Sequence, residues 1–132
     1  MFDFSEEKNF RTYKAGETIF TVGERGYDMY AVIEGEVEIR LGSNYISTAR
    51  ENEVFGEMAL IDQKDRTATA YAVKDSTVAV ICEVRFRELL KNPDFSVDMM
   101  RVVSSRLRTE MRIKRELSHE ASLRAVGISV AS

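Results

Sequence analysis

The sequence predicts a mainly-β domain, a β-sandwich or barrel, followed by C-terminal helices. Two observations support the β part: the first 82 residues hold short apolar or alternating runs, and six of the seven glycines lie within the first 56 residues, mostly between those runs. A third observation supports the helices. From about Glu83 the apolar residues recur every three or four positions, which is the helical period.

The strands are recognised by period-two alternation and by the turns between them. Glu36–Leu41 alternates polar and apolar side chains, as a strand with one buried face does. Gly23, Gly35 and Gly42 stand where runs end and supply the positive φ that tight turns need. Short strands at this spacing are typical of sandwiches and barrels. The predicted strands are Thr18–Val22, Met29–Ile33, Glu36–Leu41, Tyr45–Ala49, Thr69–Val73 and Ser76–Cys82, with Lys74-Asp75 as the last turn.

Two helices are predicted after the strands. The first runs from about Glu83 to Lys91. Asn92-Pro93-Asp94 is expected to separate this helix from the next one, because the residue before a proline avoids the α region. A long helix then follows from about Phe95 to at least Leu117, which places the helical part at about 83–123. Residues 124–132 are expected to form a loose tail.

Composition limits the class of protein. A chain of 132 residues fits one domain, and its 44% apolar and 31% charged residues are ordinary for a globular protein. The net charge of −3 gives no reason to expect nucleic-acid binding. The start of the chain lacks a signal-peptide pattern, and no apolar run approaches the ~20 residues that span a bilayer. We therefore expect a cytoplasmic protein with no membrane partner.

Catalytic and metal chemistry are not expected. Cys82 is the sole cysteine, so it forms no internal disulfide, and we expect it to be a small core residue. His119 is the sole histidine and has no partner at a metal-ligand or triad spacing. The sequence contains no Walker loop, zinc signature or nucleophile elbow. The prediction is a binding module, not an enzyme, with no catalytic residue and no metal.

One segment, Phe55–Ala70, interrupts the strand pattern. Gly56 follows a strand, Glu57–Ile61 suit little more than one helical turn, and Arg66 comes just before the next strand. A helix start presents unpaired N–H groups to an anion, and an arginine can pair with a phosphate through two donors. A phosphate would repel Glu57, so that carboxylate indicates a neutral donor nearby, such as a sugar hydroxyl. Together these side chains describe a nucleotide with a free 2′-OH.

This segment resembles the phosphate-binding cassette of the cyclic nucleotide-binding domain family. The matching residues are Phe55-Gly56-Glu57-x-Ala59-Leu60 and Arg66-Thr67-Ala68-Thr69, preceded by Gly16-Glu17-x-Ile19-Phe20-x-x-Gly23 and Met29-Tyr30-x-Val32-x-x-Gly35-x-Val37. The resemblance covers about residues 10–117. It implies one domain over 1–132: an eight-stranded jelly-roll β-roll (a double-stranded β-helix) over about 11–82, a short cassette helix and a long C-terminal helix.

The resemblance also assigns roles. It implies that Glu57 accepts a hydrogen bond from the ribose 2′-OH and that Arg66 pairs with the exocyclic phosphate oxygens. The backbone N–H groups of Gly56, Ala59 and Thr67 would face the ribose and the cyclic phosphate. The complete predicted ligand-binding set is Gly56, Glu57, Met58, Ala59, Arg66, Thr67 and Ala68.

Two further features matter to the resemblance: the long helix and Asn52. The long helix resembles the family's lid helix, which reaches over the base, and Glu110 and Met111 are its candidate lid residues. Asn52 is a departure, because the family often has glycine there. Asparagine tolerates the left-handed region, so little harm is expected.

The resulting hypothesis is a stand-alone sensor that binds cyclic AMP (cAMP) or cyclic GMP (cGMP), with no other cofactor. Only 15 residues follow Leu117, so no DNA-reading domain of the catabolite-activator type is expected. The sensor would act through an unknown effector protein, and the apolar stripe of the long helix would allow a homodimer. Thr67 could bond a guanine amino group, Glu110 could accept from either purine, and family frequency favours cAMP, so the base stays open. The alternatives are a ligand-free interaction domain of the same fold and a truncated transcription factor.

Overall fold

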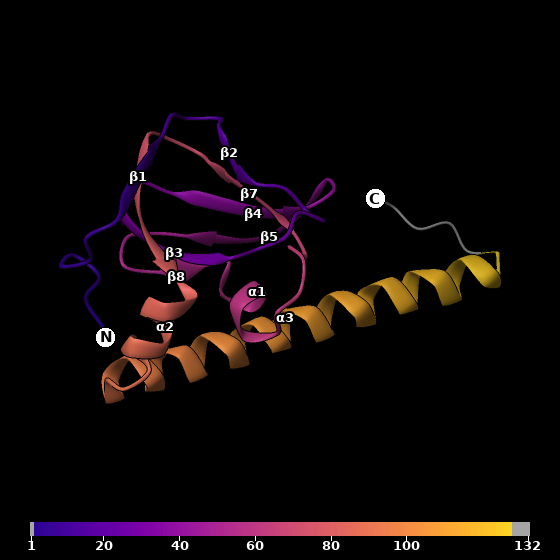
Figure 1. Cartoon of the computed structure of the whole chain (residues 1–132). Coiled ribbons are helices and arrows are strands. Elements are labelled where there is room, and N and C mark those ends of the chain that lie inside the picture. Colours follow the sequence, from indigo (N-terminus) through magenta and orange to yellow (C-terminus); the bar gives the residue numbers. More distant parts are fainter. Residues whose placement is uncertain (1, 128–132) are drawn as a thin grey trace. The chain divides into compact units, whose positions relative to one another are not determined.

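The computed structural model describes residues 2–127 and contains two compact units, one ending at Asp98 and the other beginning at Met99. Figure 1 shows their elements. The first unit holds two antiparallel four-stranded sheets, and helices follow them in the chain. The mainly-β prediction with C-terminal helices is therefore confirmed. The finer assignment, a jelly roll, stays a prediction.

The sheets pair strands that lie far apart in the sequence. One sheet has the order β1-β8-β3-β6 and the other the order β2-β7-β4-β5. The first and last strands, β1 and β8, lie side by side and antiparallel, with Phe10 opposite Ala79. The strands are β1 (Phe10–Tyr13), β2 (Thr18–Phe20), β3 (Asp28–Glu34), β4 (Val37–Leu41), β5 (Asn44–Ala49), β6 (Val54–Phe55), β7 (Thr69–Ala72) and β8 (Ser76–Cys82).

The predicted strands match these bounds to within two residues, and the sequence pattern missed only two others, β1 and β6. Three of the four residues of β1 are exposed, so the strand carries no alternating signal. β6 has two residues, both buried, which is too short for any period. Both strands are defined by their partners, β8 and β3, rather than by their own residues.

The core lies between the sheets, and both contribute to it. Its most distinctive part is a stack of three rings on different strands: Phe20, Tyr30 and Phe55 (hereafter the aromatic stack). Their centroids are 5.1–6.1 Å apart, with interplanar angles of 18–29°. The buried core cluster is Phe20, Tyr30, Val32, Val37, Ala49, Phe55, Ala70 and Val78.

Three helices complete the described chain: α1 (Glu57–Ile61), α2 (Glu83–Leu89) and α3 (Pro93–Ala125). α3 begins at Pro93, two residues before the predicted start. The Asn92 side chain caps it, since its Oδ1 accepts hydrogen bonds from the Asp94 N–H at 2.9 Å and the Phe95 N–H at 3.2 Å. Proline suits the first helical position, because it has no backbone N–H and an N–H at that position would have no partner within the helix.

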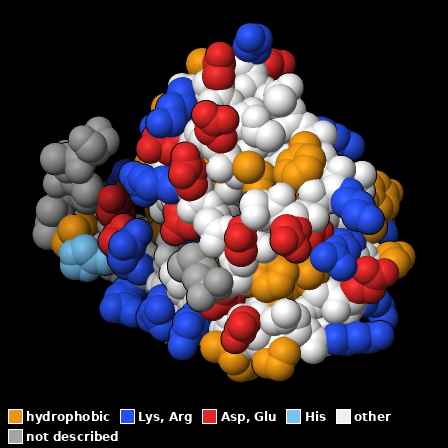
Figure 2. All heavy atoms as spheres, turned by 90° about the vertical axis from the view of Figure 1, so that its left-hand side faces the viewer, with side chains coloured by type: hydrophobic (Ala, Val, Ile, Leu, Met, Phe, Trp, Pro, Cys, Tyr) orange, Lys and Arg blue, Asp and Glu red, His pale blue; other side chains and the backbone are white. Residues whose placement is uncertain are grey.

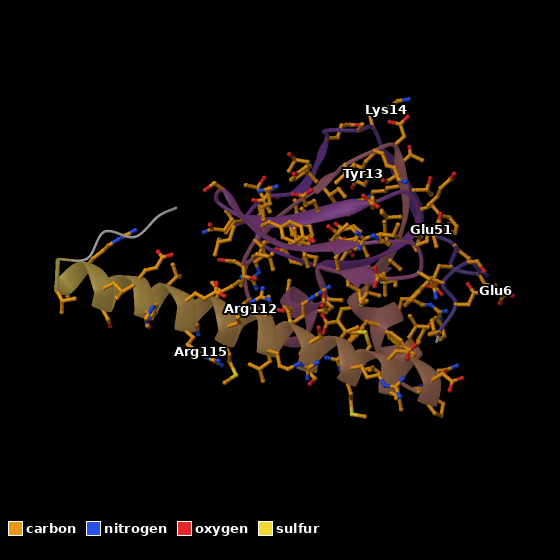
Figure 3. The ribbon with its side chains drawn as sticks, turned by 180° about the vertical axis from the view of Figure 1, so that it is seen from behind. Glu6, Tyr13, Lys14, Glu51, Arg112 and Arg115 are labelled. Atoms are coloured by element: carbon orange, nitrogen blue, oxygen red, sulfur yellow. The ribbon has the colours of Figure 1, made fainter. Side chains whose placement is uncertain are left out.

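The far end of α3 also differs from the prediction. Arg124 and Ala125 are helical, so the predicted tail starts two residues too early. The rest of that tail, residues 128–132, lies outside the described residues. Figure 3 shows Arg112 and Arg115 on this helix, and the Nε of Arg112 lies 3.9 Å from a Glu116 carboxylate oxygen. No helix within residues 2–127 has the length and apolarity needed to cross a membrane.

The surface is mixed in charge on the face that Figure 2 presents. Acidic, basic and apolar side chains alternate over it. The prediction that Cys82 is a core residue is wrong, because Cys82 is exposed. It is the last residue of β8, where the sheet ends and α2 begins, so the burial pattern of the strand does not extend to it.

An N-terminal arm, Phe2–Glu7, is held against the β-domain by Asn52. The Asn52 side chain donates to the Phe2 carbonyl at 2.8 Å and accepts from the Phe4 N–H at 3.3 Å. Asn52 has φ 64°, which confirms that asparagine occupies the left-handed region here. The Phe2 N–H also donates to Asp98 Oδ2 at 2.6 Å. The departure from glycine therefore gives this chain a contact that glycine cannot make.

Aromatic packing and an ion pair complete the arm. The Phe95 ring lies 5.3 Å from that of Phe2 and 6.1 Å from that of Phe4. The buried carboxylate of Glu7 accepts hydrogen bonds from Arg85 Nε at 2.8 Å and from its Nη2 at 2.7 Å. These contacts join the arm to α2 and to the first turn of α3.

Asn52→Gly should lower the free energy of unfolding by about 1–2 kcal/mol, the loss of two neutral hydrogen bonds. Glycine accepts the positive φ, so this change removes the contacts without adding strain. Gln63→Gly is the matched control, because Gln63 also has positive φ (52°) but is exposed. Urea denaturation of both variants measures the difference. Equal midpoints for the two would show that the arm contacts contribute nothing.

Candidate functional site

The site is built around the turn from β6 into α1. Gly56, the N-cap of α1, has φ 74° and ψ 9°, a conformation that glycine adopts without strain. The space is also restricted: a Cβ on Gly56 would stand 2.9 Å from Arg66 Nη1 and 3.1 Å from Phe20 Cε2. Glycine is required here both by conformation and by close packing. Glu57 follows in the first turn of α1 and is 1% exposed.

Arg66 returns to this turn from the other end of the cassette. Its Nη1 donates to the Gly56 carbonyl at 2.8 Å, and its Nη2 donates to the Asp28 carbonyl at 2.7 Å. The guanidinium carbon lies 4.1 Å from the centroid of the Phe20 ring and 5.7 Å from that of Tyr30. The aromatic stack therefore supports the arginine through cation–π contact.

The charge of Arg66 is held in a largely buried position. Burial lowers the pKa of its guanidinium, while the nearby phenol of Tyr30 and carboxylate of Asp28 oppose that shift. Arginine stays protonated in proteins, so the site keeps its positive charge. Both Nη atoms donate to main-chain carbonyls, which carry no net charge. These two bonds use two of the five guanidinium donors, and a two-point contact with a phosphate needs two more.

The remaining residues of the predicted ligand-binding set differ in their exposure. Met58 is half-buried, and Ala59 and Ala68 are buried, whereas Thr67 is exposed. The structure therefore brings Gly56, Glu57 and Arg66 together, as the sequence predicts, with Thr67 open to solvent beside them. The roles of these residues toward a ligand stay predictions. Glu110 and Met111 lie on α3 within the second unit, and their role as lid residues also stays a prediction.

Sequence reasoning missed three contributors to the site. Phe20 and Tyr30 are among the residues that match the family, but sequence reasoning assigned them no role at the ligand site. Asp28 contributes its backbone carbonyl, and because every residue has such an acceptor, the residue type does not indicate this role. It stands 38 residues before Arg66 in the chain, so no local spacing could have indicated it.

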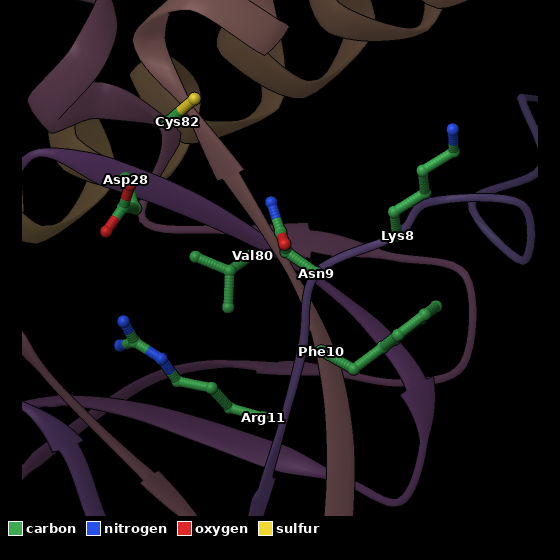
Figure 4. Close-up of a pocket in the computed structure, with 7 residues that line it drawn as sticks. All are labelled: Lys8, Asn9, Phe10, Arg11, Asp28, Val80 and Cys82. Atoms are coloured by element: carbon green, nitrogen blue, oxygen red, sulfur yellow. The ribbon is translucent and has the colours of Figure 1, made fainter.

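A pocket of about 410 Å³ lies beside β1 and β8 (Figure 4), and Asp28, whose carbonyl accepts from Arg66, is one of the residues that line it. None of its lining residues belongs to the predicted ligand-binding set. They are Lys8, Asn9, Phe10, Arg11, Asp28, Val80 and Cys82. Within the described part of the chain, no group of three or more His, Cys, Asp or Glu residues is placed to hold a metal ion.

Known proteins resemble this chain in sequence and in structure. The chain is 31% identical over 104 residues to the cyclic AMP receptor protein of Thermus thermophilus, covering 74% of this chain and 48% of the relative. The crystal structure of the Thermus thermophilus catabolite activator protein aligns with a TM-score of 0.72 at 26% identity, covering 92% of this chain and 64% of that one. The cGMP-bound form of the EAL enzyme Bd1971 aligns with a TM-score of 0.60 at 31% identity, covering 76% and 28%.

These relatives are longer than the matched region. The chain spans 7% of the length of a fungal lysophospholipase that it matches and 48% of the length of the receptor protein. A family model, the cyclic nucleotide-binding domain, matches residues 10–92. That range contains all of the sheets and the whole cassette, including Gly56, Glu57 and Arg66. This chain therefore belongs to the cyclic nucleotide-binding domain family.

Proposed function

We propose that this chain is a sensor module that binds cAMP or cGMP in the cassette and passes the signal to a partner protein. The observation that carries the proposal is the position of Arg66. This arginine is buried, and its two Nη atoms donate hydrogen bonds to backbone carbonyls beside the Gly56 turn. A positive charge fixed there suits a cyclic phosphate, a monoanion. Glu57, in the adjoining helical turn, would accept a hydrogen bond from the ribose 2′-OH.

The chemistry of the two side chains separates phosphate from sugar. A guanidinium binds phosphate through paired donors, and a carboxylate binds a hydroxyl through an acceptor. A carboxylate beside the phosphate itself would be repelled. The pair therefore favours a cyclic nucleotide with a free 2′-OH over inorganic phosphate or a deoxynucleotide.

Relatives support a purine ligand. The Bd1971 structures include a cAMP-bound form at 29% identity and TM-score 0.61, besides the cGMP-bound form. A relative that covers 74% of this chain is named a cyclic AMP receptor protein. We propose cAMP as the first ligand to test and cGMP as the second.

Signal transfer would involve α3. In this proposal, ligand contact at the cassette changes the equilibrium between states of the helix, with Glu110 and Met111 near the base. A ligand shifts such an equilibrium only through its different affinity for the two states. The apolar residues of α3, among them Leu107 and Leu117, offer a seam for an effector protein or for a second copy of the chain.

Calorimetric titration of the purified chain with cAMP and cGMP tests the proposal. Saturable binding to one site is expected, with the largest amide chemical-shift changes at Gly56–Ala59 and Arg66–Ala68. Shift changes confined to other residues would relocate the site. No saturable binding of either nucleotide at millimolar concentration would contradict the proposal.

A second candidate is a ligand-free interaction domain of the same fold. The observation that favours it is that Arg66 is already well bound by the Gly56 and Asp28 carbonyls in this structure. The fold therefore has a structural use for the arginine without any ligand. Under this alternative, Arg66→Ala would lower stability and the titration would show no binding.

Thr67 is predicted to affect the choice of base. Its side chain is exposed beside Arg66, so its hydroxyl is available to a guanine amino group. Thr67→Ala should weaken cGMP binding by about 1 kcal/mol, one neutral hydrogen bond, and change cAMP binding less. Paired titrations measure the two losses. Equal losses would remove Thr67 from the selection of the base.

A further inference from the structure

Gly26 packs directly against the functional arginine. It lies in the loop between β2 and β3, and a Cβ added there would stand 2.8 Å from both Cζ and Nε of Arg66 and 2.5 Å from the Ala59 Cβ. Separations under 3.0 Å essentially never occur for real Cβ atoms, so something would have to move. The φ of Gly26 lies outside the left-handed region. Close packing, rather than backbone conformation, is thus what requires glycine here.

The guanidinium has little freedom to move away. The Phe20 ring lies 4.1 Å from Cζ, and the Gly56 and Asp28 carbonyls hold the two Nη atoms. Gly56 also approaches closely, since a Cβ on it would reach 2.9 Å from Nη1. Arg66 therefore occupies a slot bounded by an aromatic ring, two glycine backbones and two carbonyl oxygens.

The loop that carries Gly26 is itself tied to the backbone of Arg66. The Arg66 N–H donates to the Glu24 carbonyl at 2.7 Å, and the Gly23 N–H donates to the Arg66 carbonyl at 2.8 Å. Arg25 and Asp65 form a β-bridge between these bonds and Gly26. A side chain at position 26 cannot swing away from Arg66 without breaking this pairing.

We propose that Gly26 is a positioning residue for ligand binding: with the Phe20 ring, its bare backbone holds the Arg66 guanidinium in the phosphate-binding orientation before the ligand arrives. This inference rests on the proposed function. A Cβ at position 26 would meet the Ala59 Cβ as well as the guanidinium, so Gly26→Ala shifts α1 at Ala59, displaces the guanidinium, or does both. The effect therefore appears in affinity.

The test is a double-mutant cycle between Gly26→Ala and Arg66→Ala, with cAMP and cGMP titrations of the full chain. Gly26→Ala alone is expected to weaken binding about tenfold or more, as expected when a charge-assisted contact is lost. In the Arg66→Ala background the same change is expected to have a much smaller effect, because the contact with Ala59 remains but the contact with the guanidinium is gone. Gly42→Ala is the matched control, since Gly42 has φ 61° and open space around it. It costs stability, because alanine is strained at that φ, but should leave the affinity unchanged.

A direct readout separates positioning from folding. The Nε–Hε resonance of Arg66 should be shifted by the Phe20 ring current in the free protein and should move toward the random-coil position in Gly26→Ala. Phe20→Leu, which keeps an apolar side chain but removes the ring beside the guanidinium, should give a similar loss of affinity. It replaces Gly26→Ala in the cycle should that variant not fold.

The outcomes are distinct. Wild-type affinity in Gly26→Ala, or a loss that persists in full in the Arg66→Ala background, overturns the inference. An equal loss in Gly42→Ala overturns it too. If the wild-type protein binds neither nucleotide, the proposed function fails, and the Arg66 resonance alone then decides whether Gly26 positions the guanidinium.

Discussion

Replacing Arg66 with alanine is expected to weaken cyclic-nucleotide binding by about 2–5 kcal/mol, the usual cost of removing one partner of a buried charge pair. This corresponds to roughly 30-fold to several-thousand-fold in affinity. The reason is structural: the variant loses the guanidinium that two carbonyls and an aromatic ring hold at the site. Isothermal calorimetry with cAMP and cGMP measures the loss.

The control for this prediction is Arg66→Lys. Lysine keeps the charge but has no planar fork, so it cannot serve the Gly56 carbonyl, the Asp28 carbonyl and a phosphate in the same geometry. Its affinity should fall between those of the wild type and Arg66→Ala. Denaturation curves for all three proteins are needed, because both variants leave backbone carbonyls without the arginine. Unchanged affinity in a folded Arg66→Ala variant would refute the assigned role.

Glu57→Ala should cost about 1.5–3 kcal/mol of binding free energy, the contribution of one hydrogen bond to a charged group. The loss should be confined to ligands with a ribose 2′-OH. Glu57 is 1% exposed and takes part in interactions within the fold, so its carboxylate is fixed in position before any ligand binds. Titration with cAMP and with 2′-deoxy-cAMP measures this dependence.

The two ligands make an internal control. The wild type should prefer cAMP over the deoxy analogue by roughly tenfold to a hundredfold. Glu57→Ala should bind both alike, and Glu57→Gln, which keeps the volume and one acceptor, should be intermediate. A preference for cAMP that survives in Glu57→Ala would assign the sugar contact to another residue. A fall in stability alone moves both affinities together and leaves their ratio unchanged.

The sequence predicted the parts of the structure that local pattern determines. The strand Val37–Leu41 alternates apolar and polar side chains and is followed by Gly42, so its bounds could be predicted to within one residue without the fold. The cassette is also local, because Gly56, Glu57 and Arg66 lie within eleven residues of one another. The start of α3 was misplaced because Asn92-Pro93 reads equally as a break and as a helix cap with proline in the first turn.

The surroundings of Arg66 could not be predicted, because they are assembled from distant elements. Phe20 comes from β2, Asp28 from β3, and neither has a chemical signature that points to an arginine. Gly26 is even less visible, since its contribution is the absence of a side chain. Cys82 failed for a different reason: it ends β8 and is the N-cap of α2, and the apolar run does not show that burial stops at Ile81.

The aromatic stack gives the protein an optical signal of its own. The chain has no tryptophan, so its near-ultraviolet absorption comes mainly from five tyrosines. Tyr30 is 5% exposed, stacked on Phe55, and its ring centroid lies 5.7 Å from the guanidinium carbon of Arg66. Burial raises the pKa of its phenol above the ordinary value. A phenol fixed in a rigid, asymmetric setting produces near-ultraviolet circular dichroism. An anion arriving at Arg66 would alter that spectrum, so occupancy could be followed without dye or label.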